Sequence, residues 1–145
     1  MEEEFHNHMR IPWHDYTRKS IGRPITEASL SEKASIIGRT GIMLLSCGTG
    51  AWRVRSSMNT LARELGITCT ADIGLLSIEY TCIDGGNCYT ESLCLFNTGV
   101  NTSKLYRMEL FVNKFSKNCK KMSGDELHTL LDQIHEIHGF YSPPF

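Results

Sequence analysis

The chain has 145 residues, of which 41% are hydrophobic and 21% charged, so it fits one globular domain and not a disordered segment. The formal net charge of -1 gives no overall field that would attract nucleic acid, and we expect no nucleic-acid partner. The longest apolar run, Ile42 to Leu45, falls far short of the roughly 20 residues that span a bilayer as a helix. We therefore expect a chain that does not itself carry a solute across a membrane.

The cysteines show neither a CxxC motif nor the Cys/His spacing of a metal site, so no metal or other cofactor is predicted. The amino terminus begins Met-Glu-Glu-Glu, without the basic and apolar regions of a secretory signal. Reduced thiols are therefore the expectation, although neighbouring strands could bring two of them within disulfide range. The six cysteines are Cys47, Cys69, Cys82, Cys88, Cys94 and Cys119.

Residues 1–28 lack a hydrophobic period and contain two prolines, which predicts a tail with one docked aromatic side chain. His6, His8 and His14 could hold a transition metal, but no further ligand is fixed nearby. Incidental histidines in a polar tail are the preferred interpretation.

Two helices follow, joined by a short glycine turn. Ser29 to Glu32 is a capping-box pattern that begins the first helix, and Gly48 is suited to end it. Gly38 and Gly41 inside this helix each cost about 1 kcal/mol relative to alanine, which indicates close approach of a neighbouring element. The second helix opens at Thr49 or Gly50, carries an apolar stripe on one side and ends at Gly66, so the two helices should pack as a hairpin. The stripe consists of Val54, Met58, Leu61, Ala62 and Leu65.

After Gly66 the hydrophobic period changes from helical to alternating, which indicates strands. The sequence Asp84-Gly85-Gly86-Asn87 has the residues that a tight hairpin turn requires. We expect a three-stranded, mainly antiparallel sheet.

Two more helices complete the predicted fold. Asn101 or Thr102 caps the third, whose inner face is Leu105, Met108, Val112, Phe115 and Cys119. A second capping-box pattern, Ser123 to Glu126, begins the fourth. The predicted fold class is α+β, with a two-helix hairpin, a three-stranded mainly antiparallel sheet and two C-terminal helices. The domain spans 29–139, between the tail 1–28 and a proline-containing tail 140–145.

The segment Leu44 to Val54 resembles the turn between the first two helices of the cytosolic N-terminal domain of threonine/serine exporter family membrane proteins. Gly48, Trp52, Arg53 and Val54 match that pattern, which has a glycine, an aromatic residue, then arginine and valine. Ala62 to Ile67, Asp84-Gly85, Thr90 and Gly99 to Asn101 extend the resemblance, which covers about Leu30 to His138.

The resemblance implies a domain coupled to a bundle of transmembrane helices in a protein that exports threonine, serine or, in relatives, dicarboxylates. In the family these helices begin soon after a position like Tyr141, so we expect this chain to be the cytosolic part, lying at the cytoplasmic face of the cell membrane. The implied partner is the transmembrane bundle of the same or a neighbouring protein. The oligomeric state stays open, a homo-oligomer included.

Gly48-Thr49-Gly50 precedes a helix that carries Arg53, and free N–H groups with a guanidinium favour a carboxylate. A small amino acid or carboxylate is the expected ligand, and the structural alternative is a turn that simply needs glycine. The predicted substrate-binding residues are Gly48, Thr49, Gly50, Arg53, Asp72 and Asn101.

No catalytic residue is predicted, because no nucleophile and base pair is identifiable. The alternative is a small hydrolase or ligand-processing enzyme acting on amino-acid-containing compounds, with Arg53 positioning a carboxylate beside Asp72, Glu79 or Asp84. Many relatives carry acidic residues where this chain has Gly50, Arg55 and Ser56, which argues against a carboxylate-dependent hydrolytic role. A regulatory, substrate-binding or assembly role in export is the expectation.

Overall fold

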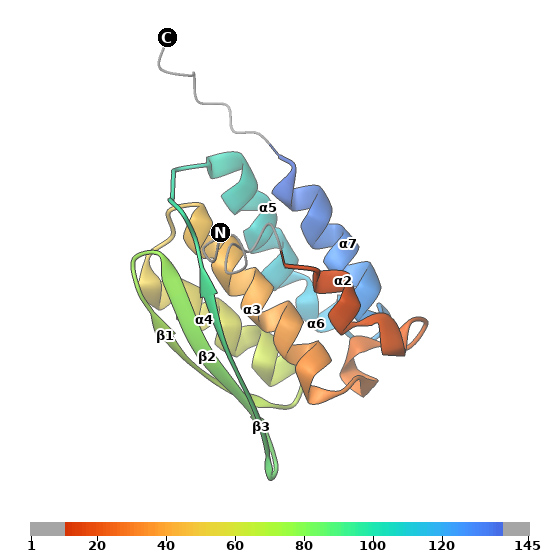
Figure 1. Ribbon diagram of the computed structural model, residues 1–145. Coiled ribbons are helices and arrows are strands. Elements are labelled where there is room, and N and C mark those ends of the chain that lie inside the picture. Colours follow the sequence, from red (N-terminus) through yellow and green to blue (C-terminus); the bar gives the residue numbers. More distant parts are fainter. Residues whose placement is uncertain (1–10, 138–145) are drawn as a thin grey trace.

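The long apolar helix α3 (Leu30–Ser46) lies in the middle of the computed structural model, which describes residues 11–137 (Figure 1). Its predicted capping box is formed: the Ser29 side chain bonds the first turn, and Glu32 bonds back to the Ser29 backbone. The helix ends as predicted, because Gly48 adopts a φ of +89°, which a side chain would disfavour.

The second helix of the predicted hairpin is α4 (Ala51–Glu64), which follows the glycine turn and packs against α3. Its buried residues are the expected stripe, with Met58 fully covered. A β-carbon on Gly41 would lie 2.5 Å from the sulfur of Met58. The close approach expected from the glycines of α3 is thus confirmed for Gly41.

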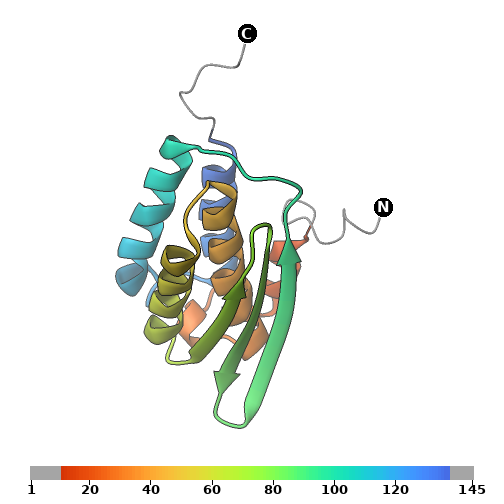
Figure 2. The same ribbon diagram turned by 90° about the vertical axis from the view of Figure 1, so that its left-hand side faces the viewer.

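The sheet has the predicted three antiparallel strands in the order β1 (Thr68–Ile73), β2 (Ser77–Asp84), β3 (Asn87–Cys94). Asp84 pairs with Asn87, so Gly85 and Gly86 alone form the turn, and Gly85 has a φ of +61°. The β2–β3 hairpin extends beyond the ends of the helices (Figure 2).

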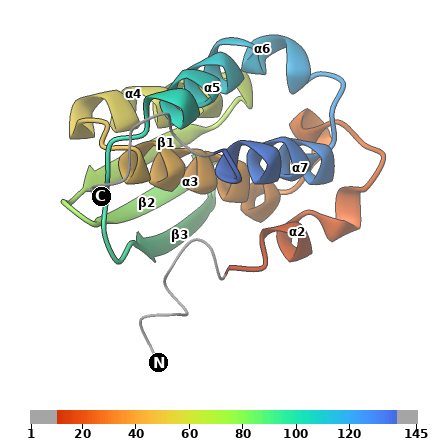
Figure 3. The same cartoon turned by 90° about the horizontal axis from the view of Figure 1, so that it is seen from above.

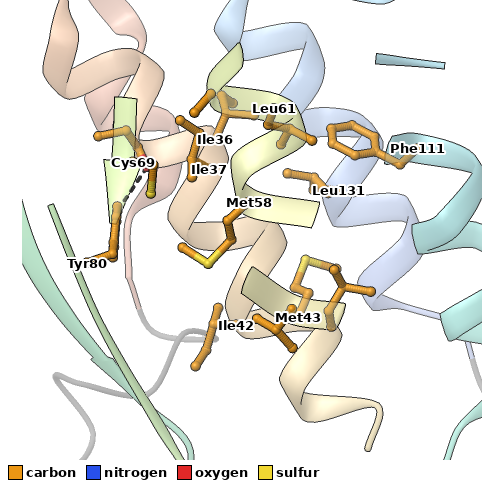
Figure 4. Close-up of a cluster of buried hydrophobic side chains, with 14 of the residues drawn as sticks. Ile36, Ile37, Ile42, Met43, Met58, Leu61, Cys69, Tyr80, Phe111 and Leu131 are labelled. Carbon is orange, nitrogen blue, oxygen red and sulfur yellow. Dashed lines mark hydrogen bonds between the residues drawn. The ribbon is translucent and has the colours of Figure 1, made fainter. Parts of the chain in front are cut away.

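The helices cover one face of the sheet only: α4 packs on β1, and α3 packs on β2 and β3 (Figure 3). Alternate residues of the strands point into this core, where Cys69 and Tyr80 belong to the same buried cluster as Ile36 and Ile37 of α3 (Figure 4). The opposite face of β1 and β2 is mostly polar and exposed. Cys69 lies directly opposite Cys82 across the strands, and all six cysteines are free thiols.

Three further helices lie on the other side of α3: α5 (Thr102–Asn113), α6 (Phe115–Asn118) and α7 (Gly124–His135). The predicted third helix is therefore interrupted at Lys114, whose backbone angles of -92° and 0° close α5 before α6 begins. Both predicted caps are present, because the Asn101 side chain accepts from the Lys104 N–H and Ser123 forms its capping box with Glu126.

Residues 11–28, expected as a tail with one docked aromatic side chain, form α2 (Trp13–Tyr16) and the short 3-10 helices η1 (Arg18–Ser20) and η2 (Ile25–Glu27). This segment packs on the domain more extensively than a tail would. Trp13 is buried, and so are Thr17 and Ile25, which lie beside Gly124 of α7. Residues 1–10 and the predicted tail 140–145 lie outside the described residues. The α+β class is confirmed.

Candidate functional site

The glycine turn between α3 and α4 leaves backbone N–H groups unoccupied at the start of α4. Gly50 is the N-cap residue and offers no side chain to the first turn, whereas α3, α5 and α7 are capped by Ser29, Asn101 and Ser123. The Arg53 N–H bonds the Gly50 carbonyl, but within the described part of the chain the N–H groups of Ala51 and Trp52 have no acceptor. Such groups, together with the helix dipole, attract an anion.

Thr49 adds a buried hydroxyl to the same turn. Its side chain is 8% exposed, and its Oγ1 atom has no hydrogen-bond partner among the residues described. A buried hydroxyl without a partner costs free energy, so a ligand that bonds it would remove this cost.

The turn borders a shallow hollow of about 460 Å³, which the segment 73–75 and the loop 97–101 also approach. The loop is tied to the turn by a 3.3 Å hydrogen bond from the Gly99 N–H to the Ser46 carbonyl. The hollow has room for a small amino acid and offers N–H donors on one side with apolar side chains around them. Its lining consists of Leu45, Gly48, Thr49, Gly50, Ala51, Ile73, Gly74, Leu75 and Thr98.

The structure separates the six predicted binding residues. Gly48, Thr49 and Gly50 share the hollow at the turn, but Arg53 lines a different one and forms a 3.1 Å ion pair with Glu109. Asp72 lies exposed on the outer face of β1, and the Asn101 side chain is engaged in capping α5. Arg53 therefore does not line the hollow at the glycine turn.

The hollow around Arg53 also bears on the enzymatic alternative. It is lined by Trp52, Arg53 and Glu109 among others, and its lining contains none of the strand carboxylates Asp72, Glu79 and Asp84. The carboxylate nearest to the Arg53 guanidinium thus comes from α5.

A second polar cluster, which the sequence did not reveal, joins α2 and α3 to α7. His14 bonds Asp125 through Nδ1 at 2.6 Å and Asp132 through Nε2 at 2.8 Å. Arg39, buried inside α3, donates to the other oxygen of Asp132 at 2.5 Å and to the carbonyl of His128 at 3.1 Å. Trp13 stacks on His128 with ring centroids 5.8 Å apart.

The surroundings of the two histidines in this cluster shift their pKa values in opposite directions. Burial alone lowers the pKa of His14, but hydrogen bonds to Asp132 and Asp125 outweigh it and raise the pKa above 6.5. Both ring nitrogens face carboxylate oxygens, which accept hydrogen bonds, so both act as donors. Burial, reinforced by Arg39, lowers the pKa of His128 to about 3, so this imidazole is neutral.

Ser35 and His128 resemble a nucleophile and base at first sight, with Oγ and Nε2 2.9 Å apart. The neutral His128 accepts from Arg39 at Nδ1, 3.2 Å away, so its Nε2 carries the proton and donates to Ser35. Ser35 in turn donates to the Glu32 carbonyl at 2.7 Å. A protonated Nε2 cannot remove a proton from the serine, and both side chains are fully buried. This chain of bonds holds α3 to α7.

The hollow beside the cluster, about 230 Å³ and lined by Trp13, His14, Arg39, Asp132 and His135 among others, is a weaker candidate for an anion. The cations His14 and Arg39 are already paired with carboxylates there. No group of three or more His, Cys, Asp or Glu side chains within residues 11–137 is arranged to hold a metal ion.

The fold and site define an α+β domain in which helices cover one face of a small antiparallel sheet, with an uncapped helix start at the turn of the helical hairpin. Residues 35–145 match the model of the ThrE family, described as "Putative threonine/serine exporter", and the chain belongs to this family. A search of curated proteins and a search of solved structures each gave no match. Among residues 11–137, no helix is long and apolar enough to cross a membrane.

Proposed function

We propose that this chain is the cytosolic domain of a threonine/serine exporter, lying at the cytoplasmic face of the membrane beside a transmembrane helical bundle. In this proposal the glycine turn binds a small amino acid or carboxylate, and occupancy of the turn regulates export. The observation that carries the proposal is the uncapped start of α4 beside the unpartnered Thr49 hydroxyl. Membership of the exporter family supports the choice of threonine, serine or a dicarboxylate as ligand.

The ligand's carboxylate would accept hydrogen bonds from the N–H groups of Ala51 and Trp52 and from the Thr49 hydroxyl. A hydrogen bond to a charged group contributes about 1.5–3 kcal/mol, so two or three of them support affinity in the micromolar to millimolar range. The apolar side chains Leu45, Ile73 and Leu75 border the same hollow and would contact the short side chain of the ligand.

We propose that this chain has a non-enzymatic role and does not act as a hydrolase on amino-acid-containing compounds. The support is chemical: His128 is neutral and donates to Ser35, and the Arg53 hollow contains Glu109 in place of the strand carboxylates. Release of a product from an amide or ester of threonine or serine by the purified chain would contradict this.

Calorimetric titration with threonine, serine and succinate tests the binding proposal. Thr49→Val removes the hydroxyl, and Ala51→Pro removes one N–H at a helix position that tolerates proline. Each change should weaken binding about tenfold, because each removes one hydrogen bond to a charged group.

Two controls make the titration specific. Arg53→Ala lies in the neighbouring hollow, and Thr102→Pro places proline at the equivalent position of the capped helix α5. Both should leave the affinity within about twofold of the parent chain. Loss of binding in Arg53→Ala alone would move the site to the Arg53 hollow, and no binding of any ligand at millimolar concentration would contradict a substrate-binding role.

A further inference from the structure

A further hollow, of about 390 Å³, lies between α5 and α7, and we call it the α5–α7 groove. It is formed where the two helices pack against each other, on the far side of α7 from Arg39. Its lining consists of Tyr106, Arg107, Leu110, Phe111, Lys114, Asn118, Leu130, Gln133 and Ile134.

The floor of the groove is apolar and recessed. Phe111 and Ile134 are each 5% exposed, while Leu110 and Leu130 are half-buried above them. At its rim the side chain of Tyr106 is 61% exposed. Exposed aromatic side chains of this kind are enriched at protein interfaces. The groove therefore offers an apolar surface that the described part of the chain leaves partly uncovered.

The only charged residues that line the groove are the cations Arg107 and Lys114, both exposed. Neither forms an ion pair with any residue in the described range 11–137. They are seven residues apart along α5 and its closing turn, so they lie on one side of the helix about 10 Å from each other. Lys117, Lys120 and Lys121 continue the positive charge beyond Lys114.

We propose that the α5–α7 groove binds an acidic amphipathic helix of a partner polypeptide. Two carboxylates seven residues apart on that helix would match the spacing of Arg107 and Lys114. Apolar residues three and four positions after the first carboxylate would then fall over Leu110, Phe111 and Leu130. The remaining lysines speed association with an acidic partner without contacting it.

A helix fits this surface better than an anionic lipid bilayer does. Surfaces that insert into a bilayer present protruding apolar side chains beside their cations. Here Phe111 and Ile134 are recessed, and Tyr106 is the one strongly exposed apolar residue of the lining. The proposal does not depend on ligand binding at the glycine turn.

Fluorescence anisotropy with a designed 18-residue helical peptide tests the proposal. The peptide carries glutamates seven residues apart with leucines between them. Arg107→Glu combined with Lys114→Glu should weaken its binding about tenfold, because two exposed charge pairs become repulsive. A peptide with lysines in place of the two glutamates should bind this double variant about tenfold more tightly than the parent chain.

Lys120→Glu combined with Lys121→Glu is the matched control, with the same change in net charge away from the lining. It should change the affinity less than threefold at physiological salt, and circular dichroism checks that both double variants fold. Failure of the lysine peptide to bind the charge-reversed variant would overturn the proposal. Equal weakening by both double variants would also overturn it, as would binding of phosphatidylglycerol vesicles in the absence of any peptide binding.

Discussion

The hydroxyl of Tyr80 occupies the place that a side chain on Gly38 would take: a β-carbon built on Gly38 lies 2.1 Å from the Tyr80 oxygen. The same hydroxyl is 2.9 Å from the Ala34 carbonyl and 3.0 Å from the Glu91 carboxylate. Gly38→Ala should lower the free energy of unfolding by about 2 kcal/mol, since overpacking outweighs the gain in helix propensity. Urea denaturation measures this.

Gly41→Ala is the matched control, because its new β-carbon meets the flexible side chain of Met58 and not a rigid ring. Gly41→Ala should lower the free energy of unfolding clearly less than Gly38→Ala does. An increase in stability for Gly38→Ala would contradict the close packing of α3 against Tyr80.

Thr49→Val should raise the free energy of unfolding by up to about 1 kcal/mol in the absence of ligand, because it replaces an unpartnered buried hydroxyl with a methyl group of similar size. Thermal denaturation with and without saturating ligand measures the effect. Parent protein should gain stability from the ligand, and the variant should gain less. A less stable variant without ligand would show that the hydroxyl has a partner in the protein.

The His14 ion pairs predict a pH-dependent contribution to stability. The pKa of His14 is raised in the folded state, so the contribution is full below 6.5 and is lost as the pH rises through the folded-state pKa. The difference in unfolding free energy between the parent chain and His14→Asn should shrink as the pH rises above 6.5 and through the folded-state pKa. His14 is 38% exposed, so the difference is less than about 1 kcal/mol. A difference that grows with pH would contradict the pairing.

His128 should act in the opposite direction. Its pKa falls from 6.5 to about 3 on folding, so between these values the unfolded chain binds the additional proton. Stability should therefore fall by about 1 kcal/mol for each pH unit on acidification from 6.5, and His128→Gln should flatten this slope. An unchanged slope in the variant would mean that His128 is protonated in the folded chain.

Local signals in the sequence were enough to predict most of the fold. Ser29 and Ser123 with their glutamates defined two helix starts, and Gly48 and Gly66 defined two helix ends by adopting positive φ. Each of these signals acts within about four residues, which is why one sequence sufficed.

Contacts between distant residues could not be predicted in this way. His14 meets Asp125 and Asp132 more than a hundred residues further on, so the docking of residues 11–28 has no local signature. The pairing of Arg53 with Glu109 likewise depends on how α4 and α5 pack. Gly48, Thr49 and Gly50 line one hollow, as grouped in the prediction, because they are adjacent in the chain. The directions in which the side chains of Arg53, Asp72 and Asn101 point depend on tertiary packing, and none of the three lines this hollow.

The most direct test of ligand binding at the glycine turn is an ¹⁵N-resolved NMR titration of the chain with threonine. We expect the amide resonances of Ala51 and Trp52 to show the largest saturable shifts, because their N–H groups would contact the carboxylate. Smaller shifts at the neighbouring Thr49 and Gly50 should follow the same binding curve. Shifts confined to the surroundings of Arg39 and His14, or no saturable shift at millimolar threonine, would contradict a binding site at the glycine turn.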